Sequence, residues 1–276
     1  MISIQPQDIS TAKLHGYLLG AVAPRPIAFA STVDAEENVN LSPFSFFNVF
    51  SAKPPILVFS PARRVRDNTT KHTLQNALET KQVVVNIVSY DMVQQMSLSS
   101  TEYAKEVNEF KKAGFTEVPS LKVAPPRVGE SPVQFECEVK EIIELGEEGG
   151  AGNLIICEVV QLHIDEKILD EDGRIDPVKI DTVARMGGNW YNRSKEGMFE
   201  VSKPLTTLGI GIDSLPPEIR ESKVLSGNDL GMLANVESLP KGVEIFVSAS
   251  EDKHREAQQQ LKNGNVSEAW KMLVKK

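Results

Sequence analysis

Cysteine is scarce in this chain. Only two cysteines occur in 276 residues, Cys137 and Cys157, and each lies in a run that is typical of a β-strand. Two isolated cysteines cannot form the disulfide framework of a small secreted domain, and their spacing is not that of a metal site. We therefore predict two reduced, buried thiols and no metal; a redox pair between neighbouring strands is the alternative.

Long apolar runs are also missing. No stretch approaches the roughly twenty apolar residues of a membrane span, and residues 1–7 lack the basic and apolar regions of a secretory signal. Acidic residues outnumber basic ones by 38 to 30, which gives a net charge of −8. This balance argues against binding to nucleic acid or to an anionic membrane surface. We expect a cytoplasmic protein without either partner.

Neither a glycine-rich dinucleotide fingerprint nor a Walker loop is found in the sequence. Any nicotinamide nucleotide would therefore have to bind without a Rossmann domain. What the chain has instead is a series of short apolar runs rich in β-branched residues, which predict antiparallel strands over 27–33, 56–59, 82–88, 133–139 and 154–164. A single helix-like segment, 69–80, separates the second of these runs from the third.

A basic, hydroxyl-rich cluster comes just before that helix-like segment. It contains three arginines within four residues, in an otherwise acidic chain, and its members are Ser60, Arg63, Arg64, Arg66, Asn68, Thr69, Thr70 and Lys71. A loop that enters a helix offers free N–H groups to an anion, and arginine and lysine add phosphate-binding donors. The alternative is that Asp67 or Asn68 merely caps the helix while the arginines are solvated.

An aromatic segment, residues 38–51, holds four of the eleven phenylalanines of the chain within seven residues. Serine and asparagine residues are interspersed among them, so one edge can offer hydrogen-bonding groups beside an apolar wall. Pro43 cannot donate to a sheet ladder and therefore indicates a strand edge, a bend or a bulge. Such a segment suits a planar heteroaromatic ligand; the alternative is a core strand with a polar outer face.

These blocks together resemble the flavin reductase-like family of FMN-binding split-barrel flavoproteins. The resemblance rests on PRPIAFASTVD, NLSPFSFFNVFS and PPILVFSPARRVRDNTTKHTL, and downstream on ESPVQFECEV, Leu162-His163-Ile164 and ARMGGNWY, and it covers roughly residues 10–195. It implies a mainly β fold, a six-stranded Greek-key split barrel with peripheral helices. It also implies bound FMN and a homodimer with the flavin near the subunit interface.

The resemblance assigns cofactor-binding residues by position. Contacts to the flavin ring are expected from Ser31, Thr32, Ser42, Pro43, Phe44, Ser45, Phe46, Phe47 and Asn48. Contacts to the phosphate are expected from Ser60, Arg63, Arg64, Thr69, Thr70 and Lys71. The stretch 97–102 is expected near the substrate opening.

Two further candidates lie downstream. The alternation of the strand at 154–164 places His163 on the polar side with Gln161 and Asp165, where a lone histidine is usually exposed and inert. The resemblance instead places His163 beside the flavin and the nicotinamide, as a catalytic residue that could donate a hydrogen bond or a proton. Arg185 could pair with an anion, although a turn that closes the barrel explains its surroundings equally well.

Beyond residue 195 the composition changes to weakly periodic sequence punctuated by glycine and proline. We predict a split-barrel domain over 1–195 and, over 196–276, an ordered extension rather than a second compact domain. The extension is predicted to end in helices over 251–262 and 267–274.

The resemblance implies an FMN-dependent oxidoreductase in which NAD(P)H reduces the flavin and the electrons pass to a second, unknown acceptor. In such enzymes the cofactor performs the chemistry and the protein positions it. The alternative is a non-catalytic FMN-binding electron carrier or flavin store that a partner protein reduces. The sequence does not distinguish NADH from NADPH.

Overall fold

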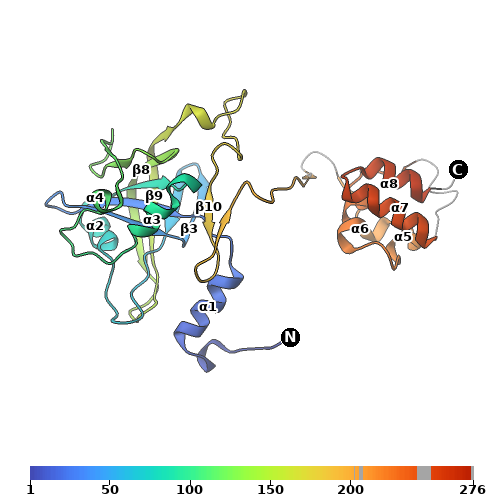
Figure 1. The fold of residues 1–276 in the computed structure, drawn as a ribbon. Coiled ribbons are helices and arrows are strands. Elements are labelled where there is room, and N and C mark those ends of the chain that lie inside the picture. Colours follow the sequence, from blue (N-terminus) through green and yellow to red (C-terminus); the bar gives the residue numbers. More distant parts are fainter. Residues whose placement is uncertain (202, 205–207, 241–249, 275–276) are drawn as a thin grey trace. The chain divides into compact units, whose positions relative to one another are not determined.

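The computed structural model describes residues 1–201, 203–204, 208–240 and 250–274. The chain divides into two compact units, Met1–Met198 and Phe199–Lys276. The strands all belong to the first unit, and the second is helical in the residues described (Figure 1). The helices in the described part of the chain are too short or too polar to cross a membrane.

A seven-stranded antiparallel sheet forms the body of the first unit. In spatial order its strands are β2 (Val39–Phe44), β1 (Ala28–Val33), β5 (Gln82–Ile87), β8 (Val133–Glu144), β9 (Asn153–Ile164), β4 (Pro55–Phe59) and β3 (Phe47–Ala52). The predicted strands are confirmed to within a few residues. Two short ribbons accompany the sheet: β6 (Glu117–Val118) with β7 (Arg127–Val128), and β10 (Val183–Arg185) with β11 (Tyr191–Arg193).

The two outermost strands of this sheet, β2 and β3, are consecutive in the chain. Only Ser45 and Phe46 separate them, so the end of β2 and the start of β3 lie at most about 11 Å apart. Because the first and last strands are tied together so closely, the sheet must curl round on itself. The resemblance implies six strands, whereas this sheet has seven, because the aromatic segment bends at Ser45 and Phe46 and supplies both edge strands.

Apolar side chains fill both faces of the curled sheet. The inner cluster includes Phe44, Phe59 and Ile155, and it is covered at one end by Leu74 and Ala77 of helix α2 (His72–Thr80). The outer cluster includes Phe29 and is covered by η2 (Tyr90–Met92), α3 (Val93–Leu98) and α4 (Glu109–Ala113). Figure 1 shows α2, α3 and α4 gathered beside the sheet.

Helix α2 begins at His72, later than the predicted start at Thr69. Asp67 does not cap it: the Asp67 carboxylate instead accepts hydrogen bonds from the backbone and side chain of Thr69. Asn68 adopts a left-handed conformation, φ 57°, that asparagine tolerates better than most residues. The chain from Asp67 to Lys71 therefore stays in the loop.

Helix α1 (Thr11–Ala21), preceded by η1 (Pro6–Asp8), leads into the sheet. Ser10 caps it by accepting a hydrogen bond from the Lys13 N–H. All eleven residues of α1 are exposed or half-buried, including Tyr17 and Leu18. This helix therefore packs only lightly on its own unit.

The second unit has a core of its own, which corrects the prediction of an extension without a compact domain. Leu215, Ile219, Leu233, Leu261 and Trp270 are buried together. These side chains come from, or directly follow, η4 (Ile212–Ser214), α5 (Pro217–Arg220), α6 (Gly227–Ala234), α7 (Glu251–Lys262) and α8 (Val266–Leu273). The two terminal helices are confirmed, with α8 starting one residue earlier than predicted.

Candidate functional site

The basic cluster folds back on itself around Arg64. Its guanidinium Nη1 donates to the Thr69 hydroxyl at 2.8 Å and to the Thr70 carbonyl at 2.6 Å. Arg63 turns elsewhere, because its guanidinium binds the side-chain and backbone oxygens of Asn68. Of the two neighbouring arginines predicted to bind phosphate, Arg64 therefore lies beside Thr69 and Thr70. Arg63 instead stabilises the loop through its hydrogen bonds to Asn68.

A small pocket joins this cluster to the aromatic segment. Arg64 and Lys71 line it together with Ser42 of β2, so the structure brings one predicted ring contact next to two predicted phosphate contacts. The remaining lining residues are Asn40, His72, Thr73, the stretch 99–103 and Glu109. Part of the stretch expected near the substrate opening, 97–102, thus forms one wall of the pocket.

Glu102 lies among the cations of the cluster, although no sequence pattern distinguishes it from the rest of the stretch 97–102. Its carboxylate is 3.0 Å from Arg64 Nε, 2.6 Å from Arg66 Nη2 and 3.7 Å from Lys71 Nζ. Hydrogen bonds from Arg66 and Arg64 lower the pKa of this carboxyl, so it is ionised near neutral pH. Three basic side chains therefore already converge on one anion.

The start of α2 adds to the positive potential of the pocket. Lys71 occupies the position before the helix, and in the structure as described no side chain caps the first N–H groups. Burial and the nearby charges of Arg64, Lys105 and Lys71 lower the pKa of His72. An uncapped helix start beside two cations is a site that favours a negatively charged group.

The other predicted ring residues divide between core and surface. Phe44 packs in the inner core and Phe47 against it, whereas Phe46 and Asn48 are exposed. Pro43 lies opposite Phe29 within β2, and an edge strand is where a sheet tolerates proline. Ser45 is half-buried at the bend. The aromatic segment is thus only partly a core strand.

Ser31, Thr32 and Ser60 are buried rather than open to the pocket. The Thr32 hydroxyl accepts a hydrogen bond from Asn76, and the Ser60 hydroxyl accepts one from the backbone of Asn153. Ser31 Oγ is buried without a hydrogen-bond partner among the residues described. These three hydroxyls are not among the residues that line the pocket.

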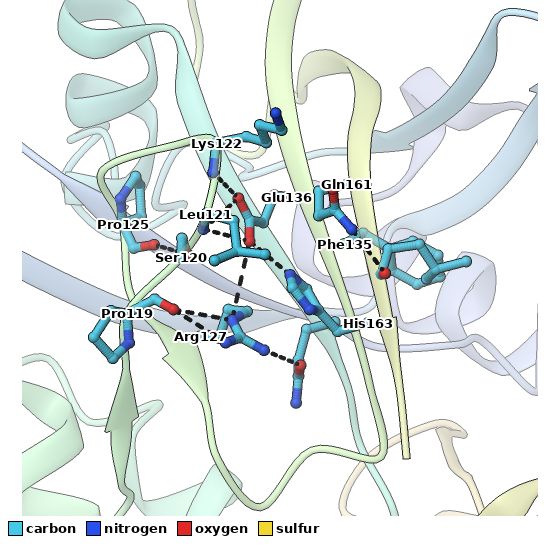
Figure 2. Close-up of polar contacts among 12 residues, drawn as sticks. Pro119, Ser120, Leu121, Lys122, Pro125, Arg127, Phe135, Glu136, Gln161 and His163 are labelled. Carbon is cyan, nitrogen blue, oxygen red and sulfur yellow. Dashed lines mark hydrogen bonds and ion pairs between the residues drawn. The ribbon is translucent and has the colours of Figure 1, made fainter. Parts of the chain in front are cut away.

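His163 does not lie on an exposed polar face. Its Nε2 is 2.6 Å from Oε1 of Glu136, and the Glu136 side chain is fully buried (Figure 2). The segment 119–128 covers this part of the sheet, and the backbone N–H groups of Leu121 and Lys122 also bind the Glu136 carboxylate. Arg127 Nε approaches the same carboxylate at 4.0 Å. The expectation that His163 is solvent-exposed is therefore wrong, since its side chain is only 18% exposed.

Burial alone would raise the pKa of Glu136. The hydrogen bonds from Leu121, His163 and Lys122 outweigh it, so the pKa is lowered and the carboxylate is ionised near neutral pH. Apolar residues alternate with polar ones along 133–139, which puts Glu136 on the polar side of a strand, and this pattern does not predict the segment that covers it. In the described part of the chain, none of the residues of this network lines the pocket at Arg64.

Arg185 lies in the β10–β11 hairpin. Its guanidinium stacks on the Tyr191 ring, 4.7 Å from the ring centre, and donates to the Gly188 carbonyl at 2.8 Å. Its backbone pairs with that of Arg25. Arg185 therefore makes local contacts within a hairpin, as the interpretation of a closing turn predicts. It does not line the pocket.

The two cysteines are buried and reduced. Burial raises the pKa of both thiols, which makes them poor nucleophiles at neutral pH. Within the residues described, no group of three or more His, Cys, Asp or Glu side chains could hold a metal ion.

Comparison with known proteins places the first unit in a family. The family model described as "Flavin reductase like domain" matches residues 20–181. The protein BH2278 of Halalkalibacterium halodurans is 36% identical over 205 residues, which are 74% of this chain and 97% of that protein. About a quarter of this chain thus lies outside that match.

Solved structures agree with this placement. Nitrilotriacetate monooxygenase component B from Bacillus cereus superimposes with a TM-score of 0.68 and 30% identity, over 73% of this chain and 98% of that one. A structure with a split barrel domain from Shewanella frigidimarina gives a TM-score of 0.62 and 24% identity, over 74% of this chain and 100% of that one. The latter similarity shows the fold alone, a mainly β split barrel.

Proposed function

Because this chain belongs to the flavin reductase-like family, we propose that it is an FMN-dependent oxidoreductase that takes electrons from NAD(P)H and passes them to a second acceptor. The observation that carries the proposal is the convergence of Arg64, Lys71 and the uncapped start of α2 on one pocket that Ser42 also lines. FMN combines a phosphate and a planar ring, and the pocket combines a phosphate-type donor set with the aromatic segment.

The donor set fits a phosphate monoester. Arg64 offers a planar guanidinium, Lys71 a point charge, and the start of α2 backbone N–H groups. An anion, the Glu102 carboxylate, already occupies the space between Arg64, Arg66 and Lys71. We assign Arg64 and Lys71, with Thr69 and Thr70 as hydroxyl donors, to the phosphate.

The ring is assigned to the bend between β2 and β3. In this assignment the backbone of residues 42–48 orients the ring, and the half-buried Phe47 forms part of its apolar wall. Bound FMN would supply the hydride acceptor and the electron store, so the protein's task is to hold and orient it. Backbone N–H groups at the bend would stabilise negative charge that develops on the ring.

A catalytic role for His163 stays a prediction. Because Nε2 is bound to Glu136, only the second ring nitrogen is left for a ligand. Glu136 would then fix the orientation of the imidazole ring, as a carboxylate partner commonly does.

A homodimer is also part of the proposal. Exposed apolar side chains lie on α1, at Tyr17 and Leu18, and on β3, at Val49 and Phe50, which are 63% and 68% exposed. Such residues are expected at a protein interface. The similarity to component B of a monooxygenase supports an electron acceptor that is a separate protein. The molar mass in solution, measured by light scattering, tests the dimer.

The visible spectrum of the protein purified without added flavin tests the proposed function. We expect a flavin spectrum, or uptake of added FMN, followed by bleaching within seconds when NADPH or NADH is added without oxygen. A flavin spectrum that persists with both nucleotides yet bleaches with dithionite would replace the reductase with an electron carrier. No flavin and no uptake of FMN would overturn the proposal.

A further inference from the structure

We propose that Glu102 is an internal competitor for the phosphate of the ligand. Its carboxylate occupies the place of the phosphate among Arg64, Arg66 and Lys71, and it must leave when a phosphate enters. This inference rests on the proposed function, because it concerns the same pocket, and it assigns a role to a residue outside the predicted donor set.

The geometry around Glu102 is that of a bound anion. One carboxylate oxygen is 3.0 Å from Arg64 Nε and 3.7 Å from Lys71 Nζ, and the other is 2.6 Å from Arg66 Nη2. Arg64 and Lys71 are the two cations of the pocket lining, and Glu102 lines the same pocket. A phosphate and this carboxylate cannot occupy the same donors at once.

The charges around the pocket favour the exchange. Arg64, Arg66 and Lys71 carry three positive charges, whereas Glu102 and Asp67, which pairs with Arg66, carry two negative ones. Within this ion-pair cluster one positive charge therefore remains uncompensated; Glu109 also lines the pocket but makes no ion pair with the cluster among the residues described. A phosphate monoester carries more negative charge than a carboxylate, about −1.5 to −2 at pH 7, and offers three acceptor oxygens.

The position of Glu102 in the chain allows it to leave. The residues just before it are tied down, because the Ser100 and Thr101 hydroxyls donate to the carbonyls of Ser97 and Leu98. Glu102 itself follows that turn, its side chain is 40% exposed, and its contacts are ion pairs near solvent. Such pairs contribute little to stability individually, so a more highly charged ligand can replace them.

Removal of the Glu102 charge should strengthen FMN binding. The test is titration of FMN and of riboflavin, which lacks the phosphate, into flavin-free protein, followed by flavin fluorescence, for the wild type and Glu102→Gln. We expect Glu102→Gln to bind FMN about tenfold more tightly and to bind riboflavin as the wild type does. The control Glu171→Gln makes the same change of charge at an exposed acidic turn and should bind FMN as the wild type does.

The outcomes separate the inference from the proposed function. If the wild type binds FMN and Glu102→Gln binds it equally or more weakly, Glu102 is not a competitor, and the phosphate site itself stands. If Glu171→Gln tightens FMN binding as much as Glu102→Gln, the effect is one of net charge and the inference is overturned. If neither the wild type nor Glu102→Gln binds FMN, the proposed function fails and the inference falls with it.

Discussion

Glu136 and His163 form a diagonal pair across β8 and β9. The register sets His163 opposite Gln134 and Glu136 opposite Gln161, yet the Glu136 carboxylate reaches His163 Nε2 at 2.6 Å. Diagonal neighbours on one face of an antiparallel pair lie within reach of long side chains. The pair is closed off by the segment 119–128, so an ionised carboxylate is buried with a full set of donors (Figure 2).

The free energy of unfolding should fall in acid partly through Glu136. Its pKa in the folded protein is lowered, so its ionised form stabilises the fold above the unfolded pKa of about 4.3, and this contribution is lost as the pH falls through the folded pKa. Glu136→Gln should unfold about 1–3 kcal/mol more easily at pH 7, and the difference from the wild type should shrink below about pH 4. Urea unfolding at a series of pH values measures the difference in free energy of unfolding between the two proteins and its dependence on pH. A constant difference at every pH would show that the ionised form contributes nothing.

Replacement of His163 tests its predicted catalytic role. Glutamine retains a donor for Glu136 but cannot transfer a proton at neutral pH. If His163 takes part in turnover, the rate at which NAD(P)H reduces bound FMN should be at least tenfold lower in the His163→Gln variant than in the wild type. The affinity of the variant for FMN should equal that of the wild type. Stopped-flow absorbance measures the rate. An unchanged rate would leave His163 with the structural role of binding Glu136.

The double variant Arg64→Ala, Lys71→Ala should lose more than tenfold in affinity for FMN, since each charge-assisted contact contributes about 1.5–3 kcal/mol. Binding of riboflavin should change much less, because it has no phosphate. The double variant Arg174→Ala, Lys223→Ala, which removes the same two kinds of positive charge at exposed positions, is the matched control. FMN affinity equal to that of the wild type would exclude this pocket as the phosphate site.

The core of the second unit can be weakened without touching the site. Leu261 is buried beside Trp270, so Leu261→Ala should destabilise this unit by about 2–5 kcal/mol. Trp190 in the first unit is 78% exposed and Trp270 is 3% exposed, and these are the two tryptophans of the chain. In a Trp190→Phe background, tryptophan emission therefore reports on the unfolding of the second unit.

The affinity of the Leu261→Ala variant for FMN should equal that of the wild type. A loss of affinity would show that the site depends on residues beyond 198.

The hairpin of β8 and β9 was predictable because its information is local. Alternation along 133–139 and a glycine-rich turn specify two paired strands, and both are found. The same alternation puts Glu136 on the face opposite the apolar cluster of Phe135 and Cys137, which is correct, but it does not predict that this face is buried. The segment 119–128, which lies just before β8 in the chain, folds back over that face, and the periodicity of a strand does not indicate what packs on it.

Composition was enough to predict the position of the basic cluster in the sequence, but not the direction in which each of its side chains points. Arg63 and Arg64 are adjacent, yet one binds Asn68 and the other Glu102. The difference follows from the tight turn at Asn68 and from a carboxylate 38 residues further along the chain. Likewise, the core of the second unit draws on apolar residues spread from 215 to 273, so it depends on contacts between segments that are far apart in the sequence.

The two-residue connection between β2 and β3 makes chain length at that point critical. β2 and β3 are not paired with each other, so both edges already carry unpaired backbone groups, and each added residue would let the edges separate by up to about 3.8 Å and give other chains more access to them. Insertions between Phe44 and Phe47 should therefore promote aggregation, whereas the exposed turn around Gly173, whose backbone hydrogen bonds are local, should tolerate them. Natural variants of this fold should then differ in length at many surface turns but keep this connection constant.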